Sequence, residues 1–378
     1  MDFFVARPHA RGNFCLSHLC KRVQLGQACR QDMASDPKPS TRPMNNPLPF
    51  ITVMMPAYNE EAYIRESLLS LISTGYPQDR MEIIVADGQS RDRTREEVAK
   101  VAEQYPFVRV IENPQSLQSA GCNLAATQAD PRSEFYIRVD AHSKWSENFL
   151  PLCIQTAKET KADLVVFVNA PVGITPFQKA LAYALQHPLG VGNSLYRLGK
   201  YSGWVDHGQH GCFTRSIWRL TNGYNNSKDL WPNEDVELSF RVAANGGRIW
   251  LNQILKMSYF PRRNIQKLAI QYFHYGIGRF TNHSITRKSF SWRQIVPVIF
   301  VWAASTSLIL TFFGFLLPSI VVFGLYSLVL LFVIAKAVFK SKDLRLIYLF
   351  TIFPTIHLCW GFGFTVAWIK RSFNHHFT

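Results

Sequence analysis

Three long apolar runs near the C-terminal end limit most strongly what this chain can fold into. They cover residues 295–318, 319–339 and 346–369, and each is long enough to cross a lipid bilayer as a helix. The first two runs contain no charged residue before Lys336, and tryptophans lie near the ends or outer parts of the runs, where membrane interfaces enrich aromatic side chains. We therefore predict about three transmembrane helices over residues 295–369. The alternative is that these runs are buried helices of a soluble core.

The distribution of charge argues against a nucleic-acid-binding protein. The formal net charge is +15, but the chain up to Glu237 carries as many acidic as basic residues. After Glu237 there are sixteen lysines and arginines and a single acidic residue, Asp343. The excess positive charge therefore lies in the same third of the chain as the apolar runs. Basic residues beside membrane helices fit anionic lipid headgroups and a cytoplasmic location.

The N-terminal segment and the cysteines carry little folding information. Residues 1–46 are polar and basic, contain the motif DPKPSTRP and show no apolar signal-peptide core, so we expect them to be disordered. The seven cysteines form no CxxC pair, which fits a reducing compartment better than a disulfide framework or a zinc ribbon. Four further parts are predicted: a globular domain 47–260, a basic amphipathic interfacial segment 261–294, the membrane region 295–369 and a tail 370–378.

Between residues 50 and 169, short apolar runs alternate with amphipathic helical stretches. The runs are FITVMMPA, MEIIVADG, FVRVIEN, EFYIRVDAH and DLVVFVN. Their alternation with helices predicts an α/β domain with a mainly parallel sheet that is covered on both faces. The sequence contains neither a GxGxxG dinucleotide fingerprint nor a P-loop. Ligands of open α/β sheets bind beyond the carboxyl ends of the strands, which here are Pro56–Glu60, Asp87–Asp92 and Asp140–His142.

The motif RVDAH places a carboxylate and an imidazole two positions apart at the end of a predicted strand. Residues two apart on an extended strand point to the same side, so Asp140 and His142 could ligate one divalent cation. Carboxylate oxygens suit Mg²⁺ and Mn²⁺, and an imidazole favours Mn²⁺. The alternative is a solvated turn with an incidental histidine, because DxH is a short pattern.

Other polar groups near these strand ends are candidates for binding and catalysis. Asp87 precedes a glycine and could accept a hydrogen bond from a base or a ribose, while Tyr58 could stack on a base or pack in the core. Asp92 fits a helix cap better than a ligand. In NEDVELSF, Glu234 and Asp235 stand at a predicted helix start, either as general-base candidates or as ordinary N-terminal helix charge.

A basic and aromatic segment, QKLAIQYFHYGIGRF, immediately precedes the membrane region. This composition over residues 266–280 predicts an amphipathic stretch at the membrane interface. Gly276 and Gly278 argue against a regular helix up to the end of the segment.

Taken in order, five motifs resemble glycosyltransferase family 2: PAYNEEAYI, VADGQSRDRT, SAGCNLA, RVDAH and NEDVELSFRVAANGGRIW. The resemblance runs from residue 50 to residue 275. Within the family, RVDAH, WVDHGQHGCFTR and QYFHYGIGR are similar to the succinoglycan biosynthesis protein ExoA group. The resemblance implies a GT-A fold, a nucleotide-sugar donor, Mn²⁺ or Mg²⁺ as cofactor, and inversion at the anomeric carbon.

The resemblance also implies roles for individual residues. Asp235 matches the catalytic base, with Glu234 beside it, and His142 stands where most relatives have the second aspartate of a DxD metal motif. The nucleotide-sugar pocket would be formed by Pro56, Ala57, Tyr58, Glu60, Asp87 and Asp140. The acceptor or diphosphate side would be formed by Asp206, Gln271, His274, Tyr275 and Arg279. The last segment falls near the QxxRW motif of processive synthases but lacks its Arg and Trp, so we expect a non-processive enzyme.

These implications lead to one main functional hypothesis. The chain would be a membrane-bound hexosyltransferase of exopolysaccharide or related glycan biosynthesis, with its catalytic domain on the cytoplasmic face of the cell (inner) membrane. Its expected partners are a nucleotide-sugar donor such as a UDP-sugar, a lipid-linked glycan acceptor, membrane lipids and polysaccharide-assembly proteins. The alternatives are a polyprenyl-phosphate sugar synthase and a catalytically inactive, membrane-tethered nucleotide-sugar binder. The presence of Asp87, Asp140 and Asp235 argues against the inactive binder.

A cytoplasmic catalytic domain also sets the predicted membrane topology. The first apolar run leaves the cytoplasm, and the second returns to KSKDLR, in agreement with the positive-inside rule. A third full span would place Lys370 and Arg371 outside, against that rule, whereas Pro354, Gly361 and Gly363 would permit a kinked or re-entrant segment. The length of the third run favours three full spans.

Overall fold

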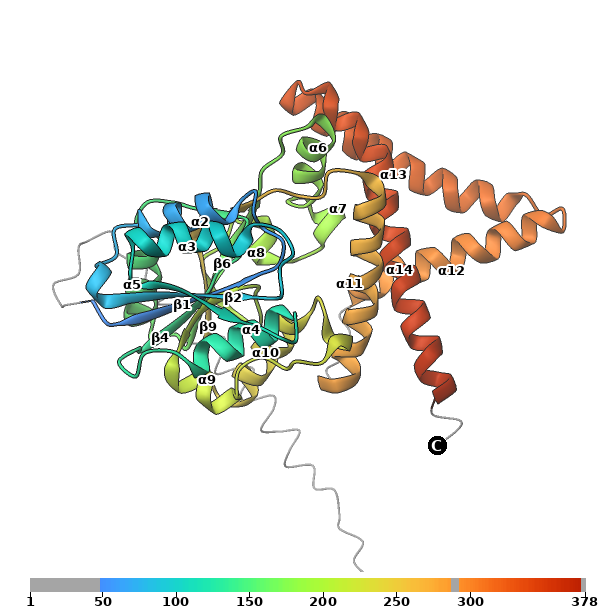
Figure 1. Cartoon of the computed structure of the whole chain (residues 1–378). Helices are drawn as coiled ribbons and strands as arrows, with labels where there is room; N and C mark the ends of the chain where they lie inside the picture. The colour runs from blue at the N-terminus through green and yellow to red at the C-terminus, as the bar shows by residue number, and fades with distance from the viewer. Residues whose placement is uncertain (1–47, 287–291, 375–378) are drawn as a thin grey trace, which may run out of the picture. The chain divides into compact units, whose positions relative to one another are not determined.

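The structure, a computed structural model, describes residues 48–286 and 292–374 (Figure 1). The segment 1–46, predicted to be disordered, lies outside the described residues, as do residues 375–378 of the predicted tail. The described part of the globular domain is built around one sheet of nine strands, and long helices follow it in the sequence.

The first half of the sheet has the predicted parallel arrangement. Its strands are β1 (Ile51–Ala57), β2 (Met81–Asp87), β3 (Val108–Glu112) and β4 (Phe135–Arg138), in the order β3-β2-β1-β4. The register pairs Ala57 with Asp87 and Asp87 with Glu112, so the carboxyl ends of these strands meet at one edge. All seven residues of β1 are buried, as expected for a strand covered on both faces.

The second half of the sheet is mixed. It contains β8 (Gly211–Thr214), β6 (Leu164–Pro171), β9 (Ile249–Tyr259) and β5 (Ser143–Trp145), with β7 (Gly203–Val205) paired to β9. Strand β8 runs antiparallel to β4 and β6, and β9 is parallel to β6 but antiparallel to β5 and β7. Strands β5, β7 and β8 are only three or four residues long, which is too short for a periodic pattern to reveal.

Helices cover both faces of the sheet (Figure 1). The helices α2 (Ile64–Ile72), α3 (Thr94–Gln104) and α5 (Phe149–Thr160) pack on one face, and α4 (Gln118–Thr127), α9 (Arg215–Thr221) and α10 (Glu234–Ala244) pack on the other. Alternate residues of β1 supply the two cores. Val53 and Met55 belong to the first apolar cluster and Met54 to the second, because successive side chains of a strand point to opposite faces.

A helical insertion between β6 and β7 connects the sheet to the C-terminal helices. It consists of α6 (Pro176–Ala184), α7 (Pro188–Val191) and α8 (Leu195–Leu198). Leu181 of α6 is fully buried in a third apolar cluster that also contains residues of the C-terminal helices, among them Leu268 and Phe353. The insertion is therefore a structural bridge between the two parts.

Four long helices form the C-terminal part. They are α11 (Ile265–Thr286), α12 (Trp292–Phe312), α13 (Leu317–Ser341) and α14 (Leu349–Asn374). Three helical segments, 294–312, 317–341 and 344–373, are long and apolar enough to cross a membrane, as predicted from the sequence. Helices α12 and α13 form a hairpin that projects away from α11 and α14 (Figure 1), and its tip exposes Phe312, Phe313 and Phe315.

Helix α11 is continuous, so the expectation that Gly276 and Gly278 would interrupt it is wrong. The two glycines instead permit close packing. A Cβ atom on Gly276 would overlap the carbonyl oxygen of Trp360 in α14, and one on Gly278 would lie 2.5 Å from the amide of Asn233, just before α10. Gly363 of α14 is used in the same way against the backbone of α11. Small residues that let two helix backbones approach are typical of helix pairs in membrane proteins.

Candidate active site

Four of the predicted nucleotide-binding residues lie at the edge where β1 and β2 end. Asp87 is buried, and its carboxylate accepts hydrogen bonds from the Ser90 amide at 3.2 Å and from the Arg95 side chain. Pro56 and Ala57, the last residues of β1, are paired in register with the last residues of β2. Tyr58 follows them and is 53% exposed, so its ring is available for stacking on a base.

Asp140 and His142 lie in the turn between β4 and β5, because β4 ends at Arg138. Each of the two side chains has its own partner. The Asp140 Oδ2 atom lies 2.9 Å from Nε2 of the buried His210, and His142 Nδ1 lies 2.9 Å from Oε1 of Glu60. Burial by itself would raise the pKa of Asp140. The neighbouring His210 and Arg138 have a larger, opposite effect, so the pKa of Asp140 lies below its ordinary value. Asp140 is therefore ionised in the fold.

One oxygen of Asp140 fits a divalent cation. Its Oδ1 atom is buried and has no hydrogen-bond partner among the described residues. Mg²⁺-type sites commonly use one or two protein carboxylates and complete their coordination with substrate phosphates and water. Within residues 48–286 and 292–374 no group of three or more His, Cys, Asp or Glu side chains gathers around one point. Asp140, with His142 nearby, thus fits a site that a bound diphosphate would complete.

A buried ionic cluster joins the end of β4 to the start of α10. The Arg138 guanidinium, 2% exposed, donates a hydrogen bond to Asp235 Oδ1 at 2.6 Å and lies 3.5 Å from Glu234 Oε1. The Tyr224 hydroxyl donates to the same Asp235 oxygen at 2.7 Å. Its ring also lies under the guanidinium, 5.1 Å from it. Arg138 therefore fixes the position of both carboxylates that the sequence singled out.

The two carboxylates of this cluster differ in their environment. Burial raises the pKa of Glu234, the charge of Arg138 opposes this, and the adjacent Asp235 adds to it. Glu234 Oε2 is buried without a partner among the described residues. Asp235, in contrast, lines a cavity of about 1100 Å³. Only Asp235 of the pair lines the space where an acceptor could bind, so it is the better placed general base.

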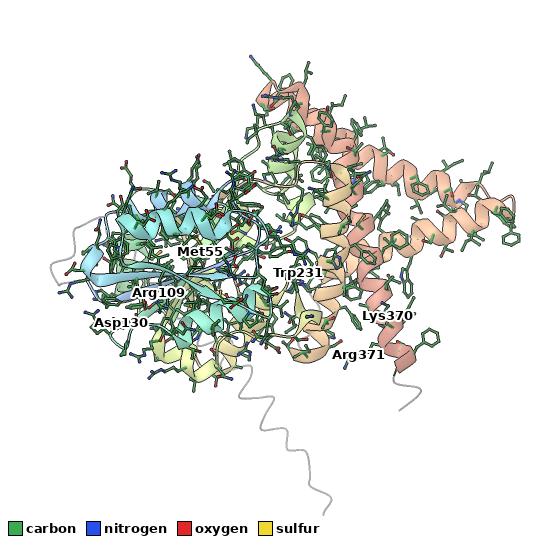
Figure 2. The ribbon with its side chains drawn as sticks, in the orientation of Figure 1. Met55, Arg109, Asp130, Trp231, Lys370 and Arg371 are labelled. Atoms are coloured by element: carbon green, nitrogen blue, oxygen red, sulfur yellow. The ribbon has the colours of Figure 1, made fainter. Side chains whose placement is uncertain are left out.

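This cavity extends from Asp235 to the C-terminal helices. Its walls include Arg197 of α8, Asp206, Tyr275 and Arg279 on the side of the sheet domain and α11. Other lining residues come from the apolar helices: Val296, Pro297, Phe300, Val329, Ile356 and Trp360. Figure 2 labels Trp231, which precedes Glu234 and Asp235 in the sequence and lies between the sheet domain and α11. The cavity therefore joins a polar, potentially catalytic end to an apolar end.

The predicted acceptor-side residues do not all reach the cavity. Asp206, Tyr275 and Arg279 line it, whereas Gln271 and His274 are absent from its lining. Gln271 donates a hydrogen bond to the Tyr275 hydroxyl at 3.0 Å, and the His274 ring packs against Trp231 at 5.4 Å. In this arrangement, Gln271 supports a cavity residue and His274 packs beside the catalytic helix.

Four residues of the site escaped prediction: Arg138, Arg197, His210 and Tyr224. A signal was present for Arg138, since a charged residue at the end of a fully apolar strand must find a buried partner. His210 and Tyr224 approach the site from segments distant in sequence, and one sequence shows no such contacts. Arg197 belongs to the helical insertion, where no motif marks it.

The fold and the site define a GT-A-type glycosyltransferase. A parallel half-sheet with polar strand ends forms the nucleotide side, and a carboxylate at the start of a buried helix faces an acceptor cavity. The chain belongs to glycosyltransferase family 2: residues 52–218 match the family's domain, described as "Glycosyl transferase family 2". It is therefore an enzyme that transfers a sugar.

Two curated relatives carry the resemblance over most of their length. The succinoglycan biosynthesis protein ExoA of Rhizobium meliloti is 34% identical over 246 residues, which cover 65% of this chain and 74% of that protein. The dolichyl N-acetyl-alpha-D-glucosaminyl phosphate 3-beta-D-2,3-diacetamido-2,3-dideoxy-beta-D-glucuronosyltransferase of Methanococcus voltae is 22% identical, covering 85% of this chain and 98% of that protein.

A solved structure confirms the fold. The mannosyltransferase PcManGT of Pyrobaculum calidifontis, determined in complex with GDP-Man and Mn²⁺, has a TM-score of 0.52 and 18% sequence identity. The likeness covers 90% of this chain and 96% of that one, and therefore includes C-terminal helices as well as the sheet domain. The predicted GT-A fold is thus confirmed.

Proposed function

We propose that this chain is a membrane-bound inverting glycosyltransferase that moves a sugar from a nucleotide-sugar donor, expected to be a UDP-sugar, to a lipid-linked glycan acceptor. The reaction would serve exopolysaccharide or related glycan biosynthesis at the cytoplasmic face of the cell membrane. One observation carries the proposal. The cavity beside Asp235 continues to the apolar helices α12, α13 and α14, so an acceptor held by a lipid can reach the catalytic carboxylate.

The residues of the chain support a single displacement. Asp235 accepts the proton of the acceptor hydroxyl as that oxygen attacks the anomeric carbon from the side opposite the leaving group. Hydrogen bonds from Arg138 and Tyr224 hold the Asp235 carboxylate in place. Asp87 and the exposed ring of Tyr58 orient the nucleoside. One displacement inverts the anomeric carbon and requires no nucleophile from the protein.

Asp140 and His142 are the residues that would hold Mn²⁺ or Mg²⁺. Such a cation supplies positive charge to the departing nucleoside diphosphate. The Mn²⁺ present in PcManGT supports the same requirement here. The relatives named above support an acceptor of the glycan-assembly type, since one is a succinoglycan biosynthesis protein and the other a dolichyl-phosphate-sugar transferase.

The substitution Asp235→Asn tests the proposal. We expect transfer of radiolabel from nucleotide sugars into a lipid extract of purified membranes to fall at least about hundredfold, because the base is lost. Binding of the nucleoside diphosphate should stay within a few-fold of the wild type, because the strand-end pocket is untouched. The matched control is Asp163→Asn, whose carboxylate accepts a hydrogen bond from the Arg248 amide on the far side of the sheet domain. Near-wild-type transfer by Asp235→Asn would place the base elsewhere, and label in a water-soluble product would contradict the lipid acceptor.

A further inference from the structure

Two arginines in the cavity have no part in the transfer chemistry described above. Arg197 belongs to the helical insertion and Arg279 to α11, so the fold brings them together from segments far apart in the sequence. Both side chains are partly exposed, and both line the same cavity as Asp235. The space that receives the acceptor therefore contains two fixed positive charges.

Neither arginine is neutralised by a carboxylate. Throughout residues 48–286 and 292–374, no ion pair within 4.0 Å involves Arg197 or Arg279. The contacts of Arg197 are aromatic, with the rings of Tyr196 and Tyr275 at 5.8 and 5.6 Å. The carboxylates that line the cavity have other partners, since Asp235 is bound by Arg138 and Asp206 lies 2.6 Å from His207.

Two unpaired arginines in one cavity are electrostatically unfavourable unless an anion binds between them. Burial lowers the pKa of Arg279, and the nearby charge of Arg197 lowers it further, although Tyr196 and Asp206 act in the opposite direction. Two neighbouring guanidinium groups without a carboxylate partner repel one another, and an anionic ligand would relieve this repulsion. Guanidinium groups bind phosphate oxygens through paired hydrogen bonds, so phosphate is the anion that two arginines suit best.

One wall of the cavity, supplied by α12, α13 and α14, is mainly apolar, although it also includes Gln294, Tyr326 and His357. Val296 and Phe300 of α12, Val329 of α13 and Ile356 of α14 line it, and all four lie in helices apolar enough to enter a membrane. A free phosphate would leave this wall in contact with water. A phosphate attached to an apolar chain would contact both walls at once, and this composition identifies the ligand as a lipid phosphate.

We propose that Arg197 and Arg279 bind the phosphate or diphosphate through which a polyprenyl lipid carries the acceptor sugar. The apolar chain leaves the cavity along α12 and α13, and the sugar points toward Asp235. The inference rests on the proposed function, because it names the group that anchors the acceptor. It makes both arginines specificity-determining residues that position the acceptor.

Binding of farnesyl diphosphate to the full-length protein in detergent micelles tests the site. We expect Arg197→Gln and Arg279→Gln each to weaken binding by about ten- to hundredfold, which is the effect of losing one charge-assisted contact, and the double variant to bind below detection. Arg279→Lys should recover part of the affinity, since it keeps the charge but not the paired hydrogen bonds. Arg371→Gln, an exposed arginine at the end of α14, is the matched control and should bind as the wild type does.

The same measurements distinguish the sources of the phosphate. Inorganic diphosphate and farnesol should each bind at least about tenfold more weakly than farnesyl diphosphate, because each contacts only one wall. Micelles of anionic phospholipid should not displace the farnesyl compound. Equal binding of inorganic diphosphate, displacement by phospholipid, or wild-type affinity in both arginine variants would overturn the proposal.

Two further readouts keep the inference separate from the proposed function. UDP binding in the presence of Mn²⁺ should be unchanged in the arginine variants, which shows that they are folded and that the nucleotide site is intact. If the wild-type enzyme transferred no sugar into lipid while farnesyl diphosphate binding still required the arginines, the proposed function would fail and the anion site would stand. If lipid was labelled normally by variants that retain binding, the anion site would fail alone.

Discussion

At the scale of single residues, Arg138 is the centre of the candidate site. Glu234 and Asp235 are adjacent, buried carboxylates in the first turn of α10, and their charges repel one another. The positive end of the helix dipole favours them, but it amounts to only about half a charge. Arg138 contributes a full charge, two nitrogens directed at the two carboxylates and a third contact to Gln118 at 3.2 Å. The charge of one buried arginine therefore compensates the charges of two neighbouring carboxylates beside the cavity.

Removing this arginine should destabilise the protein as well as inactivate it. We expect Arg138→Met to lower the free energy of unfolding by about 3–5 kcal/mol, because it leaves two buried carboxylates without a counter-charge. The apparent melting temperature in detergent should fall by at least about 6 °C. Arg132→Met is the matched control, since that arginine is 68% exposed and pairs with Asp130 at the surface. Adding Glu234→Gln to Arg138→Met should restore part of the lost stability, and no such recovery would argue against charge repulsion as the cause.

The second residue-scale prediction concerns the divalent cation. Excess chelator should abolish transfer, and Mn²⁺ should restore it, because Asp140 offers a buried oxygen that lacks a protein donor. His142→Ala should raise the Mn²⁺ concentration required for half-maximal activity by at least about tenfold, and Asp140→Ala should remove activity at any tested concentration. Lys144→Ala, two residues further along in β5, is the control, since its exposed side chain pairs with Glu66 at the surface. Full activity in chelator would remove Asp140 and His142 from the role of metal ligands.

At the scale of elements, the packing of α11 against α14 determines where the lining residues of these two helices lie in the cavity. Gly276 and Gly363 let the two backbones touch, and Phe280 packs edge-on against Phe364 at 5.3 Å. From the other face of α11, the Asn282 side chain donates a hydrogen bond to the Asn233 carbonyl at 3.2 Å. Helix α11 thus links the membrane-type helices to the residue that precedes the catalytic pair.

Separating these helices should disturb transfer more than nucleotide binding. Gly276→Leu inserts a side chain where the Trp360 carbonyl oxygen lies, so we expect the apparent melting temperature to fall by several degrees and transfer to fall at least about tenfold. UDP binding should stay near the wild-type value, because α14 packs mainly on α11, α12, α6 and α7 and not on the parallel half of the sheet. Gly324→Leu is the matched control, since no atom lies within 4 Å of a Cβ atom built at that glycine of α13. Equal effects of the two substitutions would contradict a specific role of the α11–α14 contact.

The elements that sequence reasoning found are those with local signals. Strands β1 to β4 and their helices follow from apolar runs that alternate with amphipathic stretches, and the carboxyl ends of parallel strands then define the nucleotide side. The short strands β5, β7 and β8 have no such signal. Gly276 was misread because a glycine that breaks a helix and a glycine that admits a neighbouring helix look the same without the neighbour. The pairing of Arg138 with Asp235 spans 97 positions, and only the fold reveals it.

At the scale of the whole molecule, the packing of α14 bears on how many times the chain crosses the membrane. The middle of α14 lies against parts of the protein that are polar. His357 Nε2 is 2.8 Å from the Leu189 carbonyl oxygen of α7, and Trp360 contacts Gly276 of α11. Helix α11 itself carries Gln271, Arg279 and other polar groups. If α14 crossed the bilayer, these groups would lie at the same depth in hydrocarbon, and a charged arginine there costs at least about 2.5 kcal/mol.

Helices α12 and α13 contact α14 at a few points, among them Tyr326 with His357 and Trp302 with Thr365, but they extend beyond the sheet domain as a hairpin (Figure 1). The 21 residues of α12 correspond to about 31 Å of helix, close to the thickness of the hydrocarbon core, and both helices expose mainly apolar side chains. Helix α14 exposes a smaller apolar set, Phe350, Phe362, Trp368, Ile369 and Phe373, and carries Lys370 and Arg371, which Figure 2 labels, near its C-terminal end. Basic residues at the end of a helix suit the anionic surface of a membrane. We therefore propose two crossings, with α11 and α14 lying in the interface, in place of the three full spans that length alone predicts.

Cysteine labelling in intact cells can decide between two crossings and three. In a background with the native cysteines replaced, we expect Phe315→Cys at the hairpin tip to react with a membrane-impermeant maleimide, because the hairpin carries it outside. Ser341→Cys and Ser372→Cys should react only after permeabilisation, since both ends return to the cytoplasm and the basic residues beside them obey the positive-inside rule. Reaction of Ser372→Cys in intact cells would establish a third crossing, and protection of Phe315→Cys would show that the hairpin does not cross. Sugar transfer by each variant serves as the control for native folding, because a misfolded chain could present the same cysteines to either side.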